Sequence, residues 1–444
     1  MKYLIAAILL LSHFGAEKGF SQSKTEFTFD EVWKMVEKNS PSLQSYQAQV
    51  DSLSSAKDRA ARHWSPRLFV DARTMSTNDP TQAFMTILSQ RQVQNTDFNP
   101  TTLNEPGTIS SQRGALVLDL PIYEGGGKQA QAGAVSDLAG AAKEDRENHV
   151  RELKAKVIQI YSSLLTLSEQ QVVVSGLYQE VDRYLSQYQL RRAENPVAYS
   201  GYLGLQSLKN RLHSGLETMK SQEAMLRSAL ETLASELPAG WKVTNLDREK
   251  YEVKIDPSSS RTPIEKSAEL RARAARQQVD IEKSQWLPKV GAFGEVYSFK
   301  GDRATSQGST VGLYLQWGFS GQLIGGVDQA KKAALAAEYQ TQAMGQKLRI
   351  ETQMAEKSLA VIKQNLTTIE ASLKLMQEQV ILMRKLYQSG AVNGLQLAEV
   401  FNRHFEMINQ KSELQKQWSE TISQLIILST ESESEEGVRN GSKS

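Results

Sequence analysis

The sequence contains no cysteine in its 444 residues, which excludes disulfide bonds and cysteine-ligated metal sites. It has almost no net charge either, because 52 Lys and Arg oppose 50 Asp and Glu and the two signs are interspersed along the chain. A protein that neutralises a run of phosphates needs a basic face. Since this chain has no such face, no nucleic acid is expected as a partner.

Long apolar runs are also absent, since a membrane-spanning helix needs about 20 consecutive apolar residues and no segment reaches that length. The N-terminal run, Tyr3 to Leu11, follows Lys2 and is itself followed by small residues around Ser21. This pattern predicts a secretory signal peptide over residues 1–21, cleaved near its end, rather than an uncleaved anchor. An exported chain of this kind would sit in a membrane only as a β-barrel.

The sequence does contain an internal repeat. Pro41 and Pro66 are 25 residues apart, and so are Pro263 and Pro288. Each pair encloses a segment rich in Ala, Gln and Arg, which predicts a helix that starts at the first proline and ends before the second.

The whole chain follows the same duplication. Tyr188 is followed by Gln, as is Tyr387, 199 residues later, so the chain is interpreted as two copies of about 200 residues each. The predicted organisation is a signal peptide (1–21), a first repeat (22–235), a linker (236–262), a second repeat (263–429) and a disordered tail (430–444).

Within each copy, the hydrophobic periodicity changes in the same order. Alternating patterns predict two strands of roughly ten residues in the second copy, at Val290–Phe299 and Val311–Phe319, with weaker counterparts at Arg67–Ser76 and Gln112–Pro121. Segments that repeat apolar residues every 3.5 positions, as over 355–387, predict long coiled-coil helices. Strands of this length suit a tilted membrane crossing, although a soluble two-sided sheet has the same pattern.

A single chain with four such strands and long rods would expose both sheet edges and apolar seams. Association into a closed barrel and a helical tube solves both problems, so the predicted fold class is mainly α with a membrane β portion. The segment between the first two strands, residues 78–111, is much longer than its counterpart at 301–308. Long loops of membrane barrels usually face the outside, which predicts that location for this insertion.

Several stretches carry a family resemblance. They are N-S-P-S-L (39–43) with S-P-R-L (65–68), L-D-L-P-I-Y-E-G-G-G (118–127) and Y-Q-S-G-A-V-N-G-L-Q-L-A-E-V (387–400). Together with the repeated order of elements, they resemble the outer-membrane factor (TolC-like) family of outer membrane efflux proteins. The resemblance implies a homotrimer in which each chain gives four strands to one twelve-stranded β-barrel in outer-membrane lipid, and in which twelve helices form a periplasmic coiled-coil tunnel.

The resemblance also implies a function. Such tunnels are passive exit ducts of tripartite efflux pumps and type I secretion systems in Gram-negative bacteria, and they dock on a periplasmic adaptor protein and an inner-membrane transporter. The family places a tight helix-to-helix turn shortly before Tyr188 and before Tyr387. The predicted periplasmic tip and adaptor contacts are therefore Leu165, Thr166, Leu167, Ser168, Leu366, Thr367, Thr368 and Ile369.

Two glutamates at these predicted turns, Glu169 and Glu370, are candidate gates of the pore, because an acidic ring at a constriction favours cations. The alternative is that each carboxylate lies in the first turn of a helix, where the helix dipole favours negative charge.

No catalytic, cofactor or metal site is expected. Gly125-Gly126-Gly127-Lys128 lacks the spacing of a phosphate-binding loop and is interpreted as a strand-to-helix hinge. The histidines lack a partner at the spacing of a metal pair, and no nucleophile motif is present. The alternative function is a soluble periplasmic coiled-coil adaptor, which would combine one helical hairpin with compact β-domains instead of two matched strand pairs.

Overall fold

The computed structural model describes residues 25–188, 196–247, 249–251 and 261–429. The predicted signal peptide and C-terminal tail lie outside the described residues, as do residues 248 and 252–260 of the linker. The chain forms two compact units. Of the described residues, the helical unit comprises 25–41, 150–188, 196–247, 249–251 and 353–429, and the sheet unit comprises 42–149 and 261–352.

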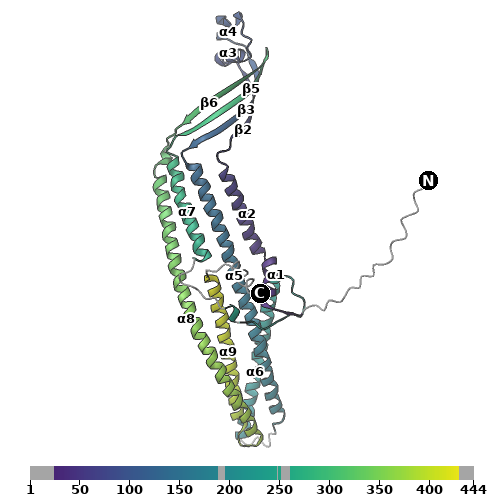
Figure 1. Cartoon of the computed structure of the whole chain (residues 1–444). Coiled ribbons are helices and arrows are strands. Elements are labelled where there is room, and N and C mark those ends of the chain that lie inside the picture. Colours follow the sequence, from purple (N-terminus) through teal and green to yellow (C-terminus); the bar gives the residue numbers. More distant parts are fainter. Residues whose placement is uncertain (1–24, 189–195, 248, 252–260, 430–444) are drawn as a thin grey trace, which may run out of the picture. The chain divides into compact units, whose positions relative to one another are not determined.

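The sheet unit contains a four-stranded antiparallel sheet in the order β2-β3-β5-β6 (Figure 1). Its strands are β2 (Arg67–Thr77), β3 (Ile109–Glu124), β5 (Lys289–Gly301) and β6 (Thr305–Gln316). All four predicted strands are present, and β3 and β5 extend beyond their predicted ranges at both ends. The predicted bounds of the last strand and of its hairpin loop at 301–308 are wrong, because residues 305–310 already pair with β5 and β6 ends at Gln316. The two copies of the repeat join where β3 pairs with β5, which leaves β2 and β6 at the edges with one partner each among the described strands.

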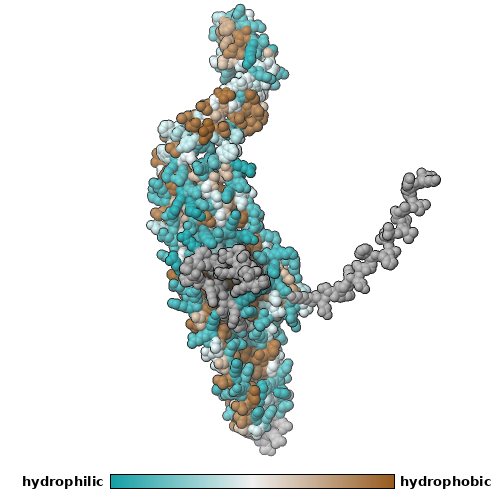
Figure 2. All heavy atoms as spheres, viewed as in Figure 1, coloured by the Kyte–Doolittle hydropathy of each residue, from teal (hydrophilic) through white to brown (hydrophobic). Residues whose placement is uncertain are grey.

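The two faces of this sheet differ in polarity. Residues paired across antiparallel strands share a face, and the register aligns Val70, Leu116 and Val296. One face, called the apolar face below, is exposed in the single chain and carries Leu68, Val70, Leu116, Leu118, Leu120, Val296, Val311, Leu313 and Leu315. Figure 2 shows hydrophobic residues gathered over the strands. The opposite face, called the polar face, carries Arg67, Asp71, Arg73, Arg113, Asp119, Glu295 and Tyr314.

The insertion between β2 and β3 folds into short helices that pack on the β5–β6 hairpin. They are α3 (Pro80–Ser89), η1 (Asn95–Phe98) and α4 (Pro100–Asn104). Arg303 in the hairpin turn forms a two-point ion pair with Asp97, with N–O distances of 2.6 and 2.7 Å. The hydrogen bond from Arg303 lowers the pKa of the Asp97 carboxyl to about 2. The buried side chain of Gln90 accepts from the backbone N–H of Arg303 at 2.7 Å. The insertion is therefore anchored to the sheet unit, and its outside location stays a prediction.

Helices complete the sheet unit. They are α2 (Pro41–Ala61), α7 (Pro263–Ser284) and the first parts of α5 (Gly127–Ser186) and α8 (Gly326–Gln388). Pro41 and Pro263 begin their helices, as the proline pairs predict, and Thr262 and Glu265 form a capping box at the start of α7. Among the described residues, no helix is both long enough and apolar enough to cross a membrane.

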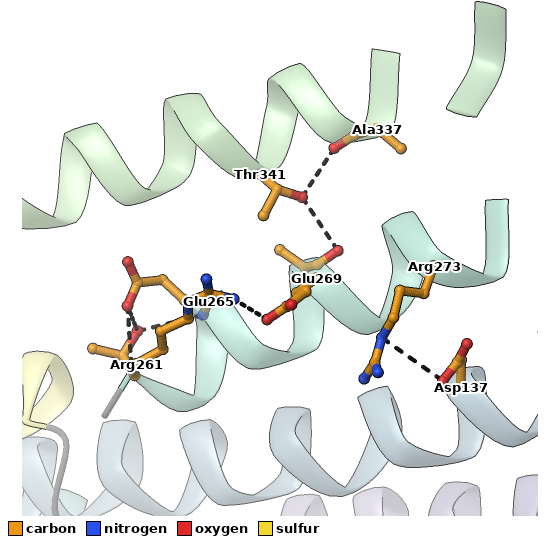
Figure 3. A network of polar contacts seen from close by, with 9 residues as sticks. Asp137, Arg261, Glu265, Glu269, Arg273, Ala337 and Thr341 are labelled. Atoms are coloured by element: carbon orange, nitrogen blue, oxygen red, sulfur yellow. Dashed lines mark hydrogen bonds and ion pairs between the residues drawn. The ribbon is translucent and has the colours of Figure 1, made fainter. Parts of the chain in front are cut away.

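Polar contacts hold α7 between its two neighbours (Figure 3). The guanidinium of Arg273 lies 3.9 Å from the Asp137 carboxylate of α5. On the other side, the hydroxyl of Thr341 in α8 donates to the backbone carbonyl of Ala268 at 3.3 Å. The apolar contact is small, since Val279 packs on two alanines of α8. These helix contacts therefore depend largely on polar groups.

The helical unit is a bundle of α6 (Pro196–Ala234), α9 (Gly394–Leu428) and the remaining parts of α5 and α8, with α1 (Phe29–Asn39) packed on α6. The unit also contains a parallel pair of short strands, β1 (Glu26–Phe27) and β4 (Lys242–Val243), and the turn η2 (Glu249–Tyr251). The buried hydroxyl of Tyr161 donates to the Phe27 carbonyl at 2.8 Å and accepts from the Thr244 amide at 3.0 Å. Tyr161 therefore ties the start of the first repeat to the linker.

The prediction of turns at 165–169 and 366–370 is wrong, because both segments lie inside the unbroken helices α5 and α8. Neither glycine nor proline occurs from 141 to 175 or from 346 to 389, so nothing in the sequence ends these helices there. Instead, α5 ends at Ser186 and α6 begins at Pro196, whereas α8 ends at Gln388 and α9 begins at Gly394.

Candidate functional site

The end of α5 and the start of α6 lie at the same end of the helical bundle as the end of α8 and the start of α9, and this end is called the turn end below (Figure 1). In the second connection, Gly390 has a φ of +77°, a left-handed conformation that glycine adopts without strain. Asn393 then caps α9, because its side chain accepts from the Gln396 amide at 3.0 Å and the Gln396 side chain accepts from the Asn393 amide at 3.0 Å. This local chemistry fixes where the chain turns.

Two glycines allow α6 and α9 to touch at the turn end. A Cβ placed on Gly201 would lie 3.1 Å from the Cα of Gly394 and 2.7 Å from the Tyr188 hydroxyl oxygen. The same hydroxyl donates to the backbone carbonyl of Ala198 at 2.7 Å. The backbones of α6 and α9 therefore touch at this point, and the side chain of Tyr188 packs over the contact.

A shared apolar core lies next to this contact. The rings of Tyr184 and Tyr387 meet edge to face with centroids 5.2 Å apart, and Phe401 is fully buried beside Tyr184. Leu205 contributes from α6, so all four helices supply side chains to one cluster. Burial raises the pKa of both tyrosine hydroxyls. Because the core is shared, a movement of α8 and α9 away from α5 and α6 would expose apolar side chains of all four helices.

This core also contains charged and titratable groups. Arg384 of α8 pairs with Glu180 of α5 at 2.5 Å. His404 of α9 is only 6% exposed, and neither of its ring nitrogens has a hydrogen-bond partner among the described residues. Burial, together with the positive charge of Arg384, lowers the pKa of the imidazole. His404 therefore stays neutral at a pH where an exposed histidine would be protonated.

We expect the stability of the bundle to fall on acidification because of His404. As the pH falls through about 6.5, the unfolded chain binds a proton at His404, whereas the folded bundle keeps the imidazole neutral. The free energy of unfolding is therefore unaffected by protonation of this residue at neutral pH and decreases below about 6.5. The loss is at most about 1.4 kcal/mol for each unit by which the pKa is lowered. The loss is measured by thermal unfolding of the wild type and of His404→Phe at pH values from about 7.5 to about 5, which bracket the usual histidine pKa of about 6.5. An equal slope in both proteins would contradict the prediction.

The predicted tip residues of α5 lie along the helix and not at a turn. Thr166 and Leu167 are buried and line a cavity of about 420 Å³ between α5, α6 and α9. Met225 of α6 lines the same cavity. Leu165 is half-buried and Ser168 is exposed.

The predicted tip residues of α8 are also separated from the turn end. Thr368 and Ile369 line a groove of about 400 Å³ between α8 and α9, which also includes Glu413. Leu366 is buried, and the exposed Thr367 donates its hydroxyl to a carbonyl of its own helix. The structure brings neither set of predicted residues into one tip.

The predicted gate residues also lie within helices. Glu169 is exposed on α5, and the Glu370 carboxylate lies 3.3 Å from the ammonium of Lys411 in α9. Neither residue is in the first turn of its helix, so the interpretation that the helix dipole places them there is wrong. Their role as a gate stays a prediction.

Reasoning from the sequence missed the polar face of the sheet. Arg67 pairs with Asp119 at 2.8 Å, and the hydroxyl of Tyr314 donates to the same carboxylate at 3.0 Å. Farther along the sheet, Arg113 pairs with Glu295. The sequence did contain a signal for this face. In β2, and in β3 as far as Asp119, the charged residues are separated by even numbers of positions, and the leucines occupy the positions between them, so the two kinds of residue point to opposite faces.

Several solved structures of outer-membrane proteins have this fold. The CmeC outer membrane channel of Campylobacter jejuni matches with a TM-score of 0.76 and 14% identity, over 94% of this chain and 89% of that chain. The open state of the MtrE outer membrane channel of Neisseria gonorrhoeae matches with a TM-score of 0.72 and 12% identity, over 90% of this chain and 88% of that chain. The outer membrane protein VceC of Vibrio cholerae matches with a TM-score of 0.70 and 16% identity, over 90% of this chain and 95% of that chain. These matches confirm the predicted fold class of long helices with strands.

Residues 261–429 match the family model described as outer membrane efflux protein. This stretch of the chain is similar to that family. The match covers the second repeat, whereas the similarity of the first repeat to the solved channels is one of fold. No curated protein sequence matches the chain. The family consists of transport proteins and not of enzymes, which agrees with the expectation from the sequence.

Proposed function

We propose that this protein is an outer membrane efflux protein that serves as the outer-membrane exit duct of a tripartite efflux pump or a type I secretion system. It would conduct substrates passively from a periplasmic adaptor and an inner-membrane transporter. Three copies would each supply four strands to a twelve-stranded barrel, and their helices would form a periplasmic tunnel. The signal peptide predicted at 1–21 provides for export.

The observation that carries this proposal is the separation of apolar and polar residues between the two faces of an open sheet. Val311 and Leu313 are 86% and 77% exposed in the single chain, whereas the polar face holds ion pairs. Barrels in outer membranes have this alternation, with apolar residues toward lipid and polar residues toward the interior. Unpaired edges at β2 and β6 support closure with neighbouring copies, because closure removes such edges.

An apolar stripe on α8 supports the same assembly. Met354, Val361, Leu375 and Leu382 are exposed and separated by seven or fourteen residues, so they lie on one side of a heptad repeat. Since such a seam is stable only when it is covered, a helix of the next copy is its expected partner in a trimer.

The adaptor would bind at or near the turn end. The connection after α8, with Gly390 and Asn393, replaces the predicted turn at 366–370 as the candidate tip. The grooves lined by Thr166 and Leu167 and by Thr368 and Ile369 remain candidate contacts on the side of the bundle. A soluble adaptor is not retained as an alternative, because its compact β-domains are not part of this channel fold.

Fractionation and single-channel recording test the proposal. The full chain is expressed in a Gram-negative host, and membranes are separated from the soluble periplasm. We expect recovery in the outer membrane as a cross-linkable trimer that forms conducting channels in planar bilayers. Recovery as a soluble periplasmic monomer without channel activity would refute the proposed function.

A further inference from the structure

A pocket in the sheet unit has no role in the function described so far. It has a volume of about 730 Å³ and lies where the end of α2, the start of β2, the end of β3 and the start of α5 meet. Its volume falls in the range of small-molecule sites, which are typically about 300–1,000 Å³. Four cationic side chains line it, namely Arg59, Arg62, Arg67 and Lys128, against the carboxylates of Asp58 and Glu124.

Three of the four cationic groups of this pocket form no direct ion pair with a described residue, although the pocket also contains the carboxylates of Asp58 and Glu124. Arg67 is occupied, because it pairs with Asp119 at 2.8 Å. Arg59, Arg62 and Lys128 are exposed, and within the described ranges none of the three forms an ion pair. Guanidinium groups match the planar, two-point geometry of carboxylate and phosphate. The pocket therefore offers donors suited to a small molecule with more than one anionic group.

The strand residues that line the pocket belong to the polar face of the sheet. Arg67 and Pro121 line it, and both lie on the same face as Asp119, since Arg67 is opposite Asp119 and Pro121 is two residues farther along β3. Leu68 and Leu120 belong to the apolar face. If the apolar face contacts lipid, as in the proposed function on which this step rests, the pocket faces the interior of the duct.

We propose that this pocket binds anionic solutes within the duct, namely small molecules with two or more carboxylate or phosphate groups. Arg59 and Arg62 of α2 and Lys128 of α5 supply the recognition. Solutes of this class are then held where the helices meet the barrel, and they occupy this site during passage.

Citrate serves as the probe, with the full-length trimer in planar bilayers of phosphatidylcholine. We expect citrate to reduce the single-channel current of the wild type, and Arg59→Gln/Arg62→Gln to raise the half-blocking concentration at least about tenfold, as for the loss of charged hydrogen bonds. Lys57→Gln is the matched control, because Lys57 lies on the same helix and does not line the pocket. It should leave the block unchanged. Calorimetric titration of the detergent-solubilised proteins with citrate should give the same order.

The outcomes separate this inference from the proposed function. A wild type that forms no channels would refute the duct itself. Channels that conduct normally, but in which citrate acts equally on wild type and the double variant or not at all, would refute the pocket alone. If phosphatidylglycerol in the bilayer abolishes the effect of citrate, the pocket holds a lipid headgroup and the assignment to solutes is wrong. Circular dichroism and trimer yield confirm that each variant is folded.

Discussion

Replacing Val311 with arginine should prevent assembly of the protein in the outer membrane, whereas the same replacement at Thr310 should be tolerated. Val311 lies near the middle of the edge strand β6, on the apolar face, and is paired with Gly294. An arginine on the lipid side of a barrel costs about 2–4 kcal/mol at the bilayer midplane, and each trimer would carry three. Thr310 is the preceding residue of β6, so its side chain is on the polar face, opposite Glu295.

The measurement is the fraction of each variant recovered from outer membranes as a trimer. We expect little or none for Val311→Arg and a value near that of the wild type for Thr310→Arg, whose new charge would lie across from the Glu295 carboxylate. If the sheet belonged to a water-soluble protein, an arginine at the highly exposed position 311 would be harmless. Equal trimer yields for the two variants would therefore contradict the membrane assignment.

The contrast between these neighbouring residues also indicates what could be predicted from sequence. Alternation found all four strands, because a sheet with two different faces imposes a period of two. It did not reveal that β3 pairs with β5 or which residues are aligned, because register depends on long-range pairing. The alternate charged residues of β2 and β3 could have identified the polar face, but not its ion pairs, because partners such as Arg67 and Asp119 are far apart in sequence.

The failure at the predicted tip has a different cause. The heptad pattern through 355–387 indicated an uninterrupted helix, which is what the structure contains. The family resemblance moved the turn to 366–370 against that evidence, although the glycine and the helix-capping asparagine occur later, at Gly390 and Asn393. Local chemistry of helix ends was the better guide there. The contact between Gly201 and Gly394 and the basic pocket depend on tertiary packing, so no local pattern could reveal them.

Opening of the turn end is expected when valine replaces Gly201. The Cβ of any residue at 201 would lie 2.7 Å from the Tyr188 hydroxyl oxygen and 3.1 Å from the backbone of Gly394. A branched side chain cannot fit without separating α6 from α9, and overpacking of this kind costs about 1–3 kcal/mol. If the turn end is the narrow entrance of the duct, separation of the hairpins should raise the conductance of reconstituted trimers several-fold and should speed proteolysis near residue 390.

Gly176→Val is the matched control for this experiment. A Cβ on Gly176 in α5 would have no heavy atom within 4 Å, so the same added side chain meets open space in the described chain. It should leave conductance and proteolysis close to those of the wild type, and valine is a better helix former than glycine. Equal behaviour of Gly201→Val and Gly176→Val would show that the glycine contact does not hold the end closed. A change confined to Gly201→Val would place the closure of the duct at Gly201 and Gly394, and not at Glu169 and Glu370, which lie within α5 and α8.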